Sequence, residues 1–246
     1  QLPWMHSLFG NAPAVATGVQ AAMRVKGRKD VRTIAQGGDG GTTDIGFGCL
    51  SGMFERNDDV LYICYDNEAY MNTGVQRSSA TPPTARTATT PAMGEAPGNV
   101  FGTGKNMPLI ALAHNIPYVA TASVANLHDL ERKVQHAMSL KGARYIHIFV
   151  PCPLGWGSAA EDTIKVARLA SECGLFPLWE GELGVVTGSN PIRKKVPVED
   201  YLATQKRFAH LFKPERDEER LAALQRMADH NIERFDLLRE DKEPAI

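Results

Sequence analysis

Three short stretches of the chain are almost entirely apolar and end in polar residues or a turn. They are residues 60–66 (VLYICYD), 118–122 (YVATA) and 143–152 (ARYIHIFVPC). Continuous apolar runs of this length are typical of strands that are buried on both faces, as in a parallel sheet. Residues 31–36 (VRTIAQ) predict a further short strand, and residues 175–189 predict a strand and a turn.

Apolar residues at helical spacing separate these strands. The pattern predicts helices over residues 11–25, 44–57, 108–115, 125–140 and 158–174, the last with Gly174 as its C-cap. Strand and helix therefore alternate, which predicts an α/β fold with a doubly wound, mostly parallel sheet.

Two segments depart from this alternation. Residues 72–107 are rich in Thr, Ser, Pro and Gly and predict a long loop, and loops of this length in compact domains are usually functional or disordered. The charged residues 198–238 predict two helical segments without an obvious core of their own. We expect an α/β domain over residues 1–197 and a helical C-terminal tail over residues 198–246, packed on that domain or on a partner subunit.

Composition narrows the function. The 246 residues are 43% hydrophobic, enough for a sizeable core. The 27 basic and 28 acidic residues give a net charge of −1, which offers no broad attraction for nucleic acid or an anionic membrane. No run of 18 apolar residues predicts a membrane span. Four scattered cysteines without a CxxC pair predict reduced thiols in a cytoplasmic protein.

The stretch AQGGDGGTTDIGFG, residues 35–48, holds six glycines around Asp39 and Asp44. It is not a Rossmann fingerprint, because Thr43 stands where the third glycine belongs. It is not a Walker loop, since residues 31–59 contain no lysine, and its carboxylates do not alternate as in an EF-hand. A plain glycine-rich turn remains an alternative. We expect Asp44 to begin the helix that follows, where its charge suits the helix dipole.

A second polar segment, YDNEAYMNTG at residues 65–74, follows the next predicted strand. Asp39 and Asn67 have 27 residues between them, about one helix and one strand, so both fall at adjacent strand ends. A carboxylate, an amide oxygen and a backbone carbonyl just beyond supply three oxygen ligands to a hard cation. Glycines beside Asp39 allow close approach of a diphosphate, and the next helix offers its N-terminal amides. Together the two segments predict a magnesium–diphosphate site.

This pairing of Gly-Asp-Gly with a later Asn resembles the thiamine-diphosphate fingerprint. Further segments extend the resemblance over nearly the whole chain: SLFGNA, GGDGGTTDIGFG, YDNEAYMNTGVQRSSATP, VPCPLGW and PVEDYLATQKRFAHLF. In this order they resemble the 2-oxoacid:ferredoxin oxidoreductase family, and within it the β subunits of pyruvate:ferredoxin oxidoreductases. The resemblance implies the pyrophosphate-type thiamine-diphosphate-binding fold.

The resemblance assigns roles to individual residues. It implies that magnesium is held by Asp39, Asn67 and the backbone of Ala69, with Gly38, Gly40 and Gly41 flanking the diphosphate. Asn72 and Thr73 match a segment that lies against the thiazolium and substrate, although Asn72 also suits a plain turn before Gly74. Phe9 and His6 match a loop that lines the cofactor pocket, and core or interface roles remain alternatives for both.

Cys152 stands between two prolines after an apolar strand. The resemblance implies that it supplies one thiolate to a [4Fe–4S] cluster whose other three ligands come from a segment ahead of SLFGNA. Cys49, Cys64 and Cys173 lie in elements that predict core instead. Because four thiolates normally hold such a cluster, either that segment precedes Gln1 in the native protein or this version has no cluster. The apolar start of the chain favours a missing segment.

The implied reaction converts pyruvate, coenzyme A and oxidised ferredoxin to acetyl-CoA, carbon dioxide and reduced ferredoxin, reversibly. The resemblance implies a hetero-oligomer in which partner subunits complete the thiamine site and supply the activating glutamate. Residues 72–107 and 198–238 are the candidate interfaces. Alternatives are the same chemistry on 2-oxoglutarate, a branched-chain or aryl 2-oxoacid or oxalate, a non-oxidative thiamine-diphosphate decarboxylase or synthase, and a non-catalytic binding subunit.

Overall fold

The computed structural model describes residues 3–238 of the chain. Six strands form one sheet in the order β1-β2-β4-β3-β5-β6. Their bounds are β1 Thr33–Gly38, β2 Val60–Asp66, β3 Tyr118–Ser123, β4 Arg144–Phe149, β5 Trp179–Glu182 and β6 Val185–Ser189. Strands β1 to β4 are parallel to one another, whereas β5 pairs antiparallel with both β3 and β6. The mostly parallel sheet confirms the predicted fold class.

Strand β1 lies two residues later than residues 31–36, the range that the sequence predicts. Its last two residues, Gly37 and Gly38, pair with Cys64 and Tyr65 of β2. Glycine is a poor strand former, so composition does not indicate strand at these positions. The parallel neighbour nevertheless extends the ladder through them, and this carries the strand up to Asp39.

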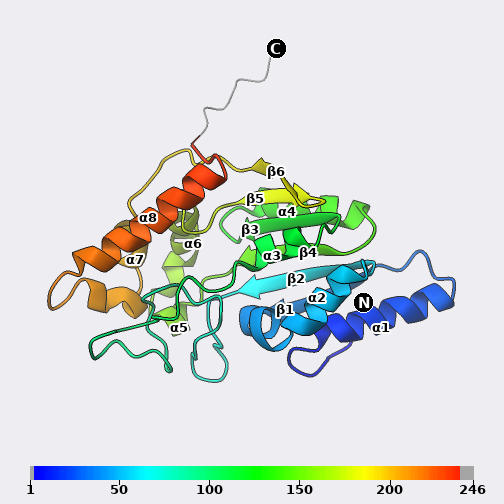
Figure 1. The fold of residues 1–246 in the computed structure, drawn as a ribbon, viewed down its shortest axis with the longest axis horizontal. Helices are drawn as coiled ribbons and strands as arrows, with labels where there is room; N and C mark the ends of the chain where they lie inside the picture. The colour runs from blue at the N-terminus through cyan, green and yellow to red at the C-terminus, as the bar shows by residue number, and fades with distance from the viewer. Residues whose placement is uncertain (1–2, 239–246) are drawn as a thin grey trace, which may run out of the picture.

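Helices lie on both faces of the sheet (Figure 1). The principal ones are α1 Ala12–Val25, α2 Phe47–Glu55, α3 Met107–Ala113, α4 Leu127–Ser139, α6 Thr163–Glu172 and α8 Glu218–Arg234. Side chains of α1, α2 and α3 pack with Val60, Tyr62 and Tyr145 on one face. Side chains of α4 pack with Leu61, Ile63 and Ile146 on the other. The two faces of one strand thus enter different clusters, as expected for a doubly wound sheet. Among the described residues no helix is long and apolar enough to cross a bilayer.

The C-terminal helices share a third cluster with the sheet rather than lacking a core. This cluster joins Phe149 of β4 and Trp156 of the short helix α5 (Pro153–Trp156) to α6. Helix α7 (Val198–Leu202), the 3-10 helix η3 (Lys206–Leu211) and α8 complete it. In Figure 1 these elements lie at the opposite end of the molecule from α1. Residues 239–246 of the expected tail lie outside the described residues.

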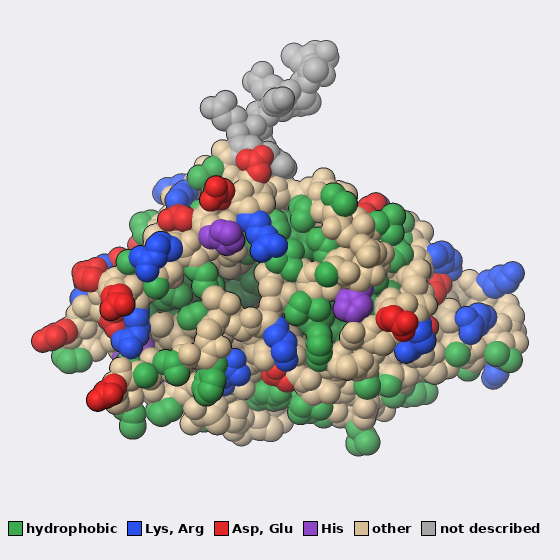
Figure 2. All heavy atoms as spheres, viewed as in Figure 1, with side chains coloured by type: hydrophobic (Ala, Val, Ile, Leu, Met, Phe, Trp, Pro, Cys, Tyr) green, Lys and Arg blue, Asp and Glu red, His purple; other side chains and the backbone are tan. Residues whose placement is uncertain are grey.

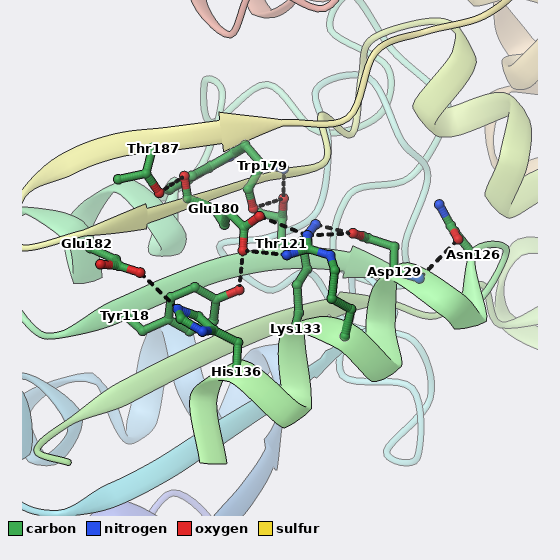
Figure 3. Close-up of polar contacts among 11 residues, drawn as sticks. Tyr118, Thr121, Asn126, Asp129, Lys133, His136, Trp179, Glu180, Glu182 and Thr187 are labelled. Carbon is green, nitrogen blue, oxygen red and sulfur yellow. Dashed lines mark hydrogen bonds and ion pairs between the residues drawn. The ribbon is translucent and has the colours of Figure 1, made fainter. Parts of the chain in front are cut away.

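A charged network fastens the antiparallel strands to α4 (Figure 3). Arg132 joins Asp129 of its own helix at 3.1 Å to Glu180 of β5 at 2.8 Å. Tyr118 also donates to Glu180, at 2.6 Å, and His136 meets Glu182 at 2.8 Å. This network joins α4 and β3 to β5. Elsewhere on the face seen in Figure 2, basic and acidic side chains are interspersed.

The parallel strands set the position of the candidate site. Strands β1 and β2 end at Gly38 and Asp66, and both ends point to the same side of the sheet. In Figure 1 the arrow of β2 points toward α5 and the long loop that follows the strand. In open α/β sheets ligands bind beyond the carboxyl ends of the strands. The Gly-Asp-Gly and Asp-Asn-Glu segments therefore lie where such sheets bind their ligands.

Candidate functional site

The chain tightens into a π-helical turn directly after β1. This turn, η1, spans Gly40–Ile45, and helix α2 begins only at Phe47. The prediction of a single helix over residues 44–57 is therefore wrong about where the helix begins. Thr42 and Thr43 donate their hydroxyls to the carbonyl oxygens of Gly38 and Asp39, at 2.7 and 2.9 Å. π-Helical turns are rare and frequently occur at functional sites.

The glycines of this segment fall into two kinds. A Cβ at Gly37 would lie 2.4 Å from the Tyr62 hydroxyl, and one at Gly40 would lie 2.4 Å from the Tyr70 ring, so packing within the chain requires both. At Gly38 a Cβ would meet nothing closer than 3.8 Å, and at Gly41 the nearest atom is the Phe9 ring at 3.4 Å. The chain itself does not require glycine at these two positions. That leaves room beside Asp39 for a ligand to approach the backbone.

Asp39, Asn67 and Ala69 come together as the sequence predicts. One terminal atom of the Asn67 amide lies 3.1 Å from Asp39 Oδ1 and 2.9 Å from the main-chain oxygen of Ala69. With nitrogen at this position, the amide donates two hydrogen bonds; with oxygen there, three oxygens face one another. Neighbouring ligands of octahedral magnesium, each 2.0–2.1 Å from the ion, lie about 3 Å apart. The spacing therefore fits a magnesium ion, which would turn the amide oxygen inward.

The burial of Asp39 supports this fit. Its carboxyl is 1% exposed and accepts a hydrogen bond from the Ser78 hydroxyl on its other oxygen. Burial raises the pKa of Asp39 to about 8, and the nearby Asp66 carboxyl adds to the rise. A buried carboxyl without a cationic partner favours its neutral form. A divalent cation at this position would supply the missing positive charge and restore the carboxylate.

A buried polar chain underlies the second segment. Asp66 accepts the Glu68 N–H at 2.8 Å with one oxygen and meets His147 Nε2 at 2.7 Å with the other. His147 Nδ1 in turn lies 2.6 Å from the Tyr145 hydroxyl. Strand β4 thereby braces the turn that carries Asn67 and Ala69. The sequence gives no signal for this contact, because His147 and Tyr145 stand inside a run that predicts a plain buried strand.

Asp44 has a different role from the one expected. It lies within η1 rather than at the start of a helix. Its carboxylate accepts hydrogen bonds from Ser79 N–H at 3.0 Å and Tyr70 O–H at 3.1 Å, and pairs with Lys105 at 3.2 Å. Tyr70, Ser79 and Lys105 belong to the segment around the long loop. Asp44 therefore ties that loop to the Gly-Asp-Gly segment.

The C-terminal tail also reaches the second segment. Arg207 of η3 meets Glu68 at 2.5 Å, and its guanidinium carbon lies 3.7 Å from the centre of the Trp156 ring. Trp156 donates its indole N–H to the main-chain oxygen of Asn67 at 2.9 Å. Arg207 thus contacts Glu68, which lies between the proposed ligands Asn67 and Ala69, and Trp156 contacts Asn67 itself. Sequence reasoning missed these two residues.

The remaining candidates lie toward the rim of the site. Asn72 and Thr73 are exposed in a turn closed by the Tyr70–Gln76 bridge, and Thr73 donates to Gln76 at 2.5 Å. The ring of Phe9 is 60% exposed and lies 6.0 Å from that of Tyr70, above Gly41. His6 is exposed and makes no hydrogen bond or ring contact among residues 3–238. The structure thus brings Phe9 to the Gly-Asp-Gly segment, but His6 makes no contact with it.

Cys152 lies beside the second segment, at the N-terminus of α5. A Cβ at Gly155 would meet the sulfur of Met71 at 2.3 Å and that of Cys152 at 3.5 Å. Cys64 is buried in β2, and Cys173 is buried directly after the last residue of α6. Cys49 is partly buried in α2. No group of three His, Cys, Asp or Glu side chains within residues 3–238 could hold a metal ion. The residues that the structure describes therefore do not form a complete [4Fe–4S] site by themselves, and the role of Cys152 as a ligand stays a prediction.

Comparison with known proteins agrees with this geometry. Residues 1–148 match the family model for the C-terminal thiamine pyrophosphate-binding domain of thiamine pyrophosphate enzymes. Pyruvate synthase subunit PorB of Methanosarcina barkeri is 52% identical over 238 residues, covering 96% of this chain and 80% of the relative. Ketoisovalerate oxidoreductase subunit VorB of Pyrococcus abyssi is 44% identical over 215 residues, covering 85% of this chain and 69% of the relative.

A solved structure points to the same family. The 2-oxoglutarate:ferredoxin oxidoreductase from Magnetococcus marinus, determined with 2-oxoglutarate, coenzyme A and succinyl-CoA bound, is 33% identical with a TM-score of 0.52. The similarity covers 61% of this chain and 47% of that chain. The chain belongs to the thiamine pyrophosphate enzymes and, within them, to the β subunits of the 2-oxoacid:ferredoxin oxidoreductase family.

Proposed function

We propose that this chain binds the diphosphate half of thiamine diphosphate in an oxidoreductase that acts on pyruvate. The reaction is pyruvate, coenzyme A and oxidised ferredoxin to acetyl-CoA, carbon dioxide and reduced ferredoxin, in either direction. The observation that carries the proposal is the convergence of Asp39, Asn67 and Ala69, with spacings of 3.1 and 2.9 Å that suit magnesium. The pyruvate synthase name of the relative that is 52% identical supports the substrate.

The residues of this chain bind and orient rather than react. Asp39, Asn67 and the Ala69 carbonyl would hold magnesium, and Gly38 and Gly41 leave the backbone accessible to the diphosphate. Bound thiamine diphosphate supplies the nucleophilic carbon and the electron sink for decarboxylation. Asn72 and Thr73 stand exposed at the rim, from which they would contact the substrate.

A partner subunit would complete the site. Apolar side chains near it are exposed in the single chain, among them Phe9 at 60%, Ile45 at 62% and Leu154 at 94%. Large apolar side chains gathered around one site mark interaction surfaces more often than free solvent contact. We infer that the partner covers these residues and brings the remaining groups for catalysis. Four free cysteines support a cytoplasmic location.

Replacement of Asp39 by Ala in the assembled complex tests the proposal. We expect magnesium-dependent binding of thiamine diphosphate, measured by calorimetry, to weaken at least about 100-fold, because a ligand that carries full charge is lost. Asp30→Ala serves as the control, since Asp30 is exposed and its one ion pair within residues 3–238 is with the exposed Arg28. Unchanged binding in the Asp39 variant would remove the basis for a magnesium–diphosphate site in this chain.

A second substrate is supported by the VorB relative, whose name refers to ketoisovalerate. The ratio of kcat/KM for pyruvate to that for 3-methyl-2-oxobutanoate in the assembled complex decides between the two. We expect the ratio to exceed one by at least about tenfold, since pockets discriminate against extra methyl groups by steric exclusion. A ratio below one would mean that a branched-chain 2-oxoacid, and not pyruvate, is the preferred substrate.

A further inference from the structure

We propose that Arg207, from the C-terminal tail, is a positioning residue that holds the turn Asn67–Ala69 in the shape required for magnesium. The inference rests on the proposed function, in which Asn67 and Ala69 are two of the ligands. It gives the tail a part in the cofactor site itself, beyond packing against the sheet.

The turn that carries the two ligands is conformationally unfavourable by itself. Glu68 stands between them with a φ of 64°, a left-handed conformation that residues other than glycine seldom adopt. Such a conformation persists only where surrounding contacts hold it, and it is often found at ligand sites. At Glu68 the backbone is held by the Asp66 carboxylate, which accepts the Glu68 N–H at 2.8 Å. The side chain is held by Arg207 at 2.5 Å.

Arg207 acts on both sides of Glu68. It contacts the Glu68 carboxylate directly, and its guanidinium carbon lies over the Trp156 ring, 3.7 Å from the ring centre. Trp156 then donates its indole N–H to the main-chain oxygen of Asn67 at 2.9 Å. One side chain thus fixes the residue between the two ligands and, through the indole, the backbone of the first ligand.

Arg207 is itself fixed. Its side chain is 4% exposed, and its Nε donates to Gln205 at 2.8 Å while Nη2 donates to the Tyr201 hydroxyl at 3.2 Å. Its main-chain oxygen accepts the Arg86 N–H of the long loop at 2.9 Å. A planar guanidinium with this many contacts holds its partners in one geometry, which a flexible lysine does not. The turn is therefore braced from a rigid point.

The consequence is a preference among cations. Magnesium requires near-ideal octahedral geometry at 2.0–2.1 Å, whereas calcium accepts longer and more varied arrangements. A turn that relaxes by a few tenths of an ångström loses its fit for magnesium but continues to fit calcium. Loss of Arg207 should therefore change which cation supports cofactor binding, a property that simple destabilisation of the tail would not alter.

The test compares Arg207→Gln, Arg207→Lys and Glu68→Gln in the assembled complex. Binding of thiamine diphosphate is measured by calorimetry with magnesium alone and with calcium alone, and the ratio of the two half-saturating cation concentrations is determined. We expect Arg207→Gln to raise the magnesium value at least about tenfold and the calcium value less than threefold. Arg207→Lys should lie close to Gln, because it keeps the charge but loses the planar stacking, and Glu68→Gln should change the ratio in the same direction.

Arg216→Gln is the matched control, since Arg216 lies in the same tail and pairs with Glu199 on the exposed surface. It should leave the ratio unchanged. The inference is overturned if Arg207→Gln shifts both cation values equally or behaves like Arg216→Gln. The Asp39→Ala variant distinguishes a failure of this inference from a failure of the proposed function. If Asp39→Ala loses thiamine diphosphate binding while the Arg207 variants keep the ratio of half-saturating cation concentrations unchanged, only the positioning role is rejected. If Arg207→Gln does not assemble, Glu68→Gln, which leaves the tail intact, decides by the same ratio.

Discussion

The indole N–H of Trp156 donates to the main-chain oxygen of Asn67 at 2.9 Å, a contact between α5 and the turn that follows β2. Trp156→Phe removes this bond but keeps an aromatic ring against Arg207. We expect the free energy of unfolding to fall by about 1–2 kcal/mol more than a loss of ring volume explains, because a carbonyl loses its donor. Urea unfolding measures the loss. Trp179→Phe is the control, since Trp179 stacks on Phe235 at 5.2 Å and makes no side-chain hydrogen bond within residues 3–238. If both variants lose the same free energy of unfolding, the hydrogen bond from Trp156 to Asn67 contributes nothing measurable to stability.

Gly38 and Gly40 are expected to respond differently to alanine. Gly40→Ala forces a methyl group to within 2.4 Å of the Tyr70 ring and should destabilise the chain by about 1–3 kcal/mol. Gly38→Ala has space within the chain and should leave the unfolding free energy within about 0.5 kcal/mol. Its affinity for thiamine diphosphate should nevertheless fall at least about tenfold, because the methyl group occupies the approach of the diphosphate. A normal affinity in Gly38→Ala would place the diphosphate elsewhere.

Cys152 is predicted to be an iron ligand in the assembled complex. Cys152→Ser should lower the iron content by up to about four atoms per chain of this type, since a cluster with three thiolates is held poorly. Elemental analysis and the visible absorbance of the purified complex measure this. Cys49→Ser replaces a cysteine on α2, which is also partly buried, and should leave both values unchanged. Equal iron in the two variants would contradict the assignment.

Lys133 is expected to contribute more to stability than its neighbour Arg132 (Figure 3). Its side chain is fully buried, and Nζ donates to Asp129 at 2.6 Å and to the Thr121 carbonyl at 2.8 Å. Lys133→Met leaves both acceptors without this donor, and we expect a loss of about 3 kcal/mol in the free energy of unfolding. Arg132 is 52% exposed, so Arg132→Met should cost about 1 kcal/mol or less. Chemical denaturation of both variants measures the two losses in the free energy of unfolding. A larger loss for Arg132→Met than for Lys133→Met would contradict the prediction.

The thiols are expected to differ in reactivity. Burial raises the pKa of Cys173 to about 12, and alkylating reagents attack the thiolate. At pH 8 only about one in 10,000 Cys173 groups would be ionised in the folded chain, because each pH unit below the pKa lowers the thiolate tenfold. Iodoacetamide followed by mass spectrometry should label Cys49, which is partly exposed, well before Cys173. Urea should remove the difference, and persistent equal labelling without urea would contradict the buried placement.

Much of the fold is predictable because the parallel strands are buried on both faces. Residues 60–66 read as one apolar run, and β2 spans Val60–Asp66. The start of the helix after Asp39 is not predictable in this way. Thr42 and Thr43 turn their hydroxyls back to the carbonyls of Gly38 and Asp39, and the backbone over Gly40–Ile45 forms the π-helical turn η1. Residue spacing alone does not distinguish this turn from an ordinary α-helix.

The position of the proposed magnesium ligands is predictable for a related reason. Asp39 and Asn67 follow the carboxyl ends of two adjacent parallel strands, so topology alone brings them together. Trp156 and Arg207 lie 89 and 139 residues beyond their partners in the second segment, and no periodic pattern links them. Their contacts depend on how the C-terminal helices pack in three dimensions. The residues that contact the turn are thus harder to predict from the sequence than the proposed ligands themselves.

The contact between Glu68 and Arg207 can form only after both residues have been synthesised. Glu68 leaves the ribosome 139 residues ahead of Arg207, a delay on the order of ten seconds at ordinary rates of synthesis. During that interval the Asp66 carboxylate can hold the Glu68 N–H, but the Glu68 side chain lacks its contact with Arg207. On the positioning role proposed for Arg207, the turn would reach its final shape only after this contact forms.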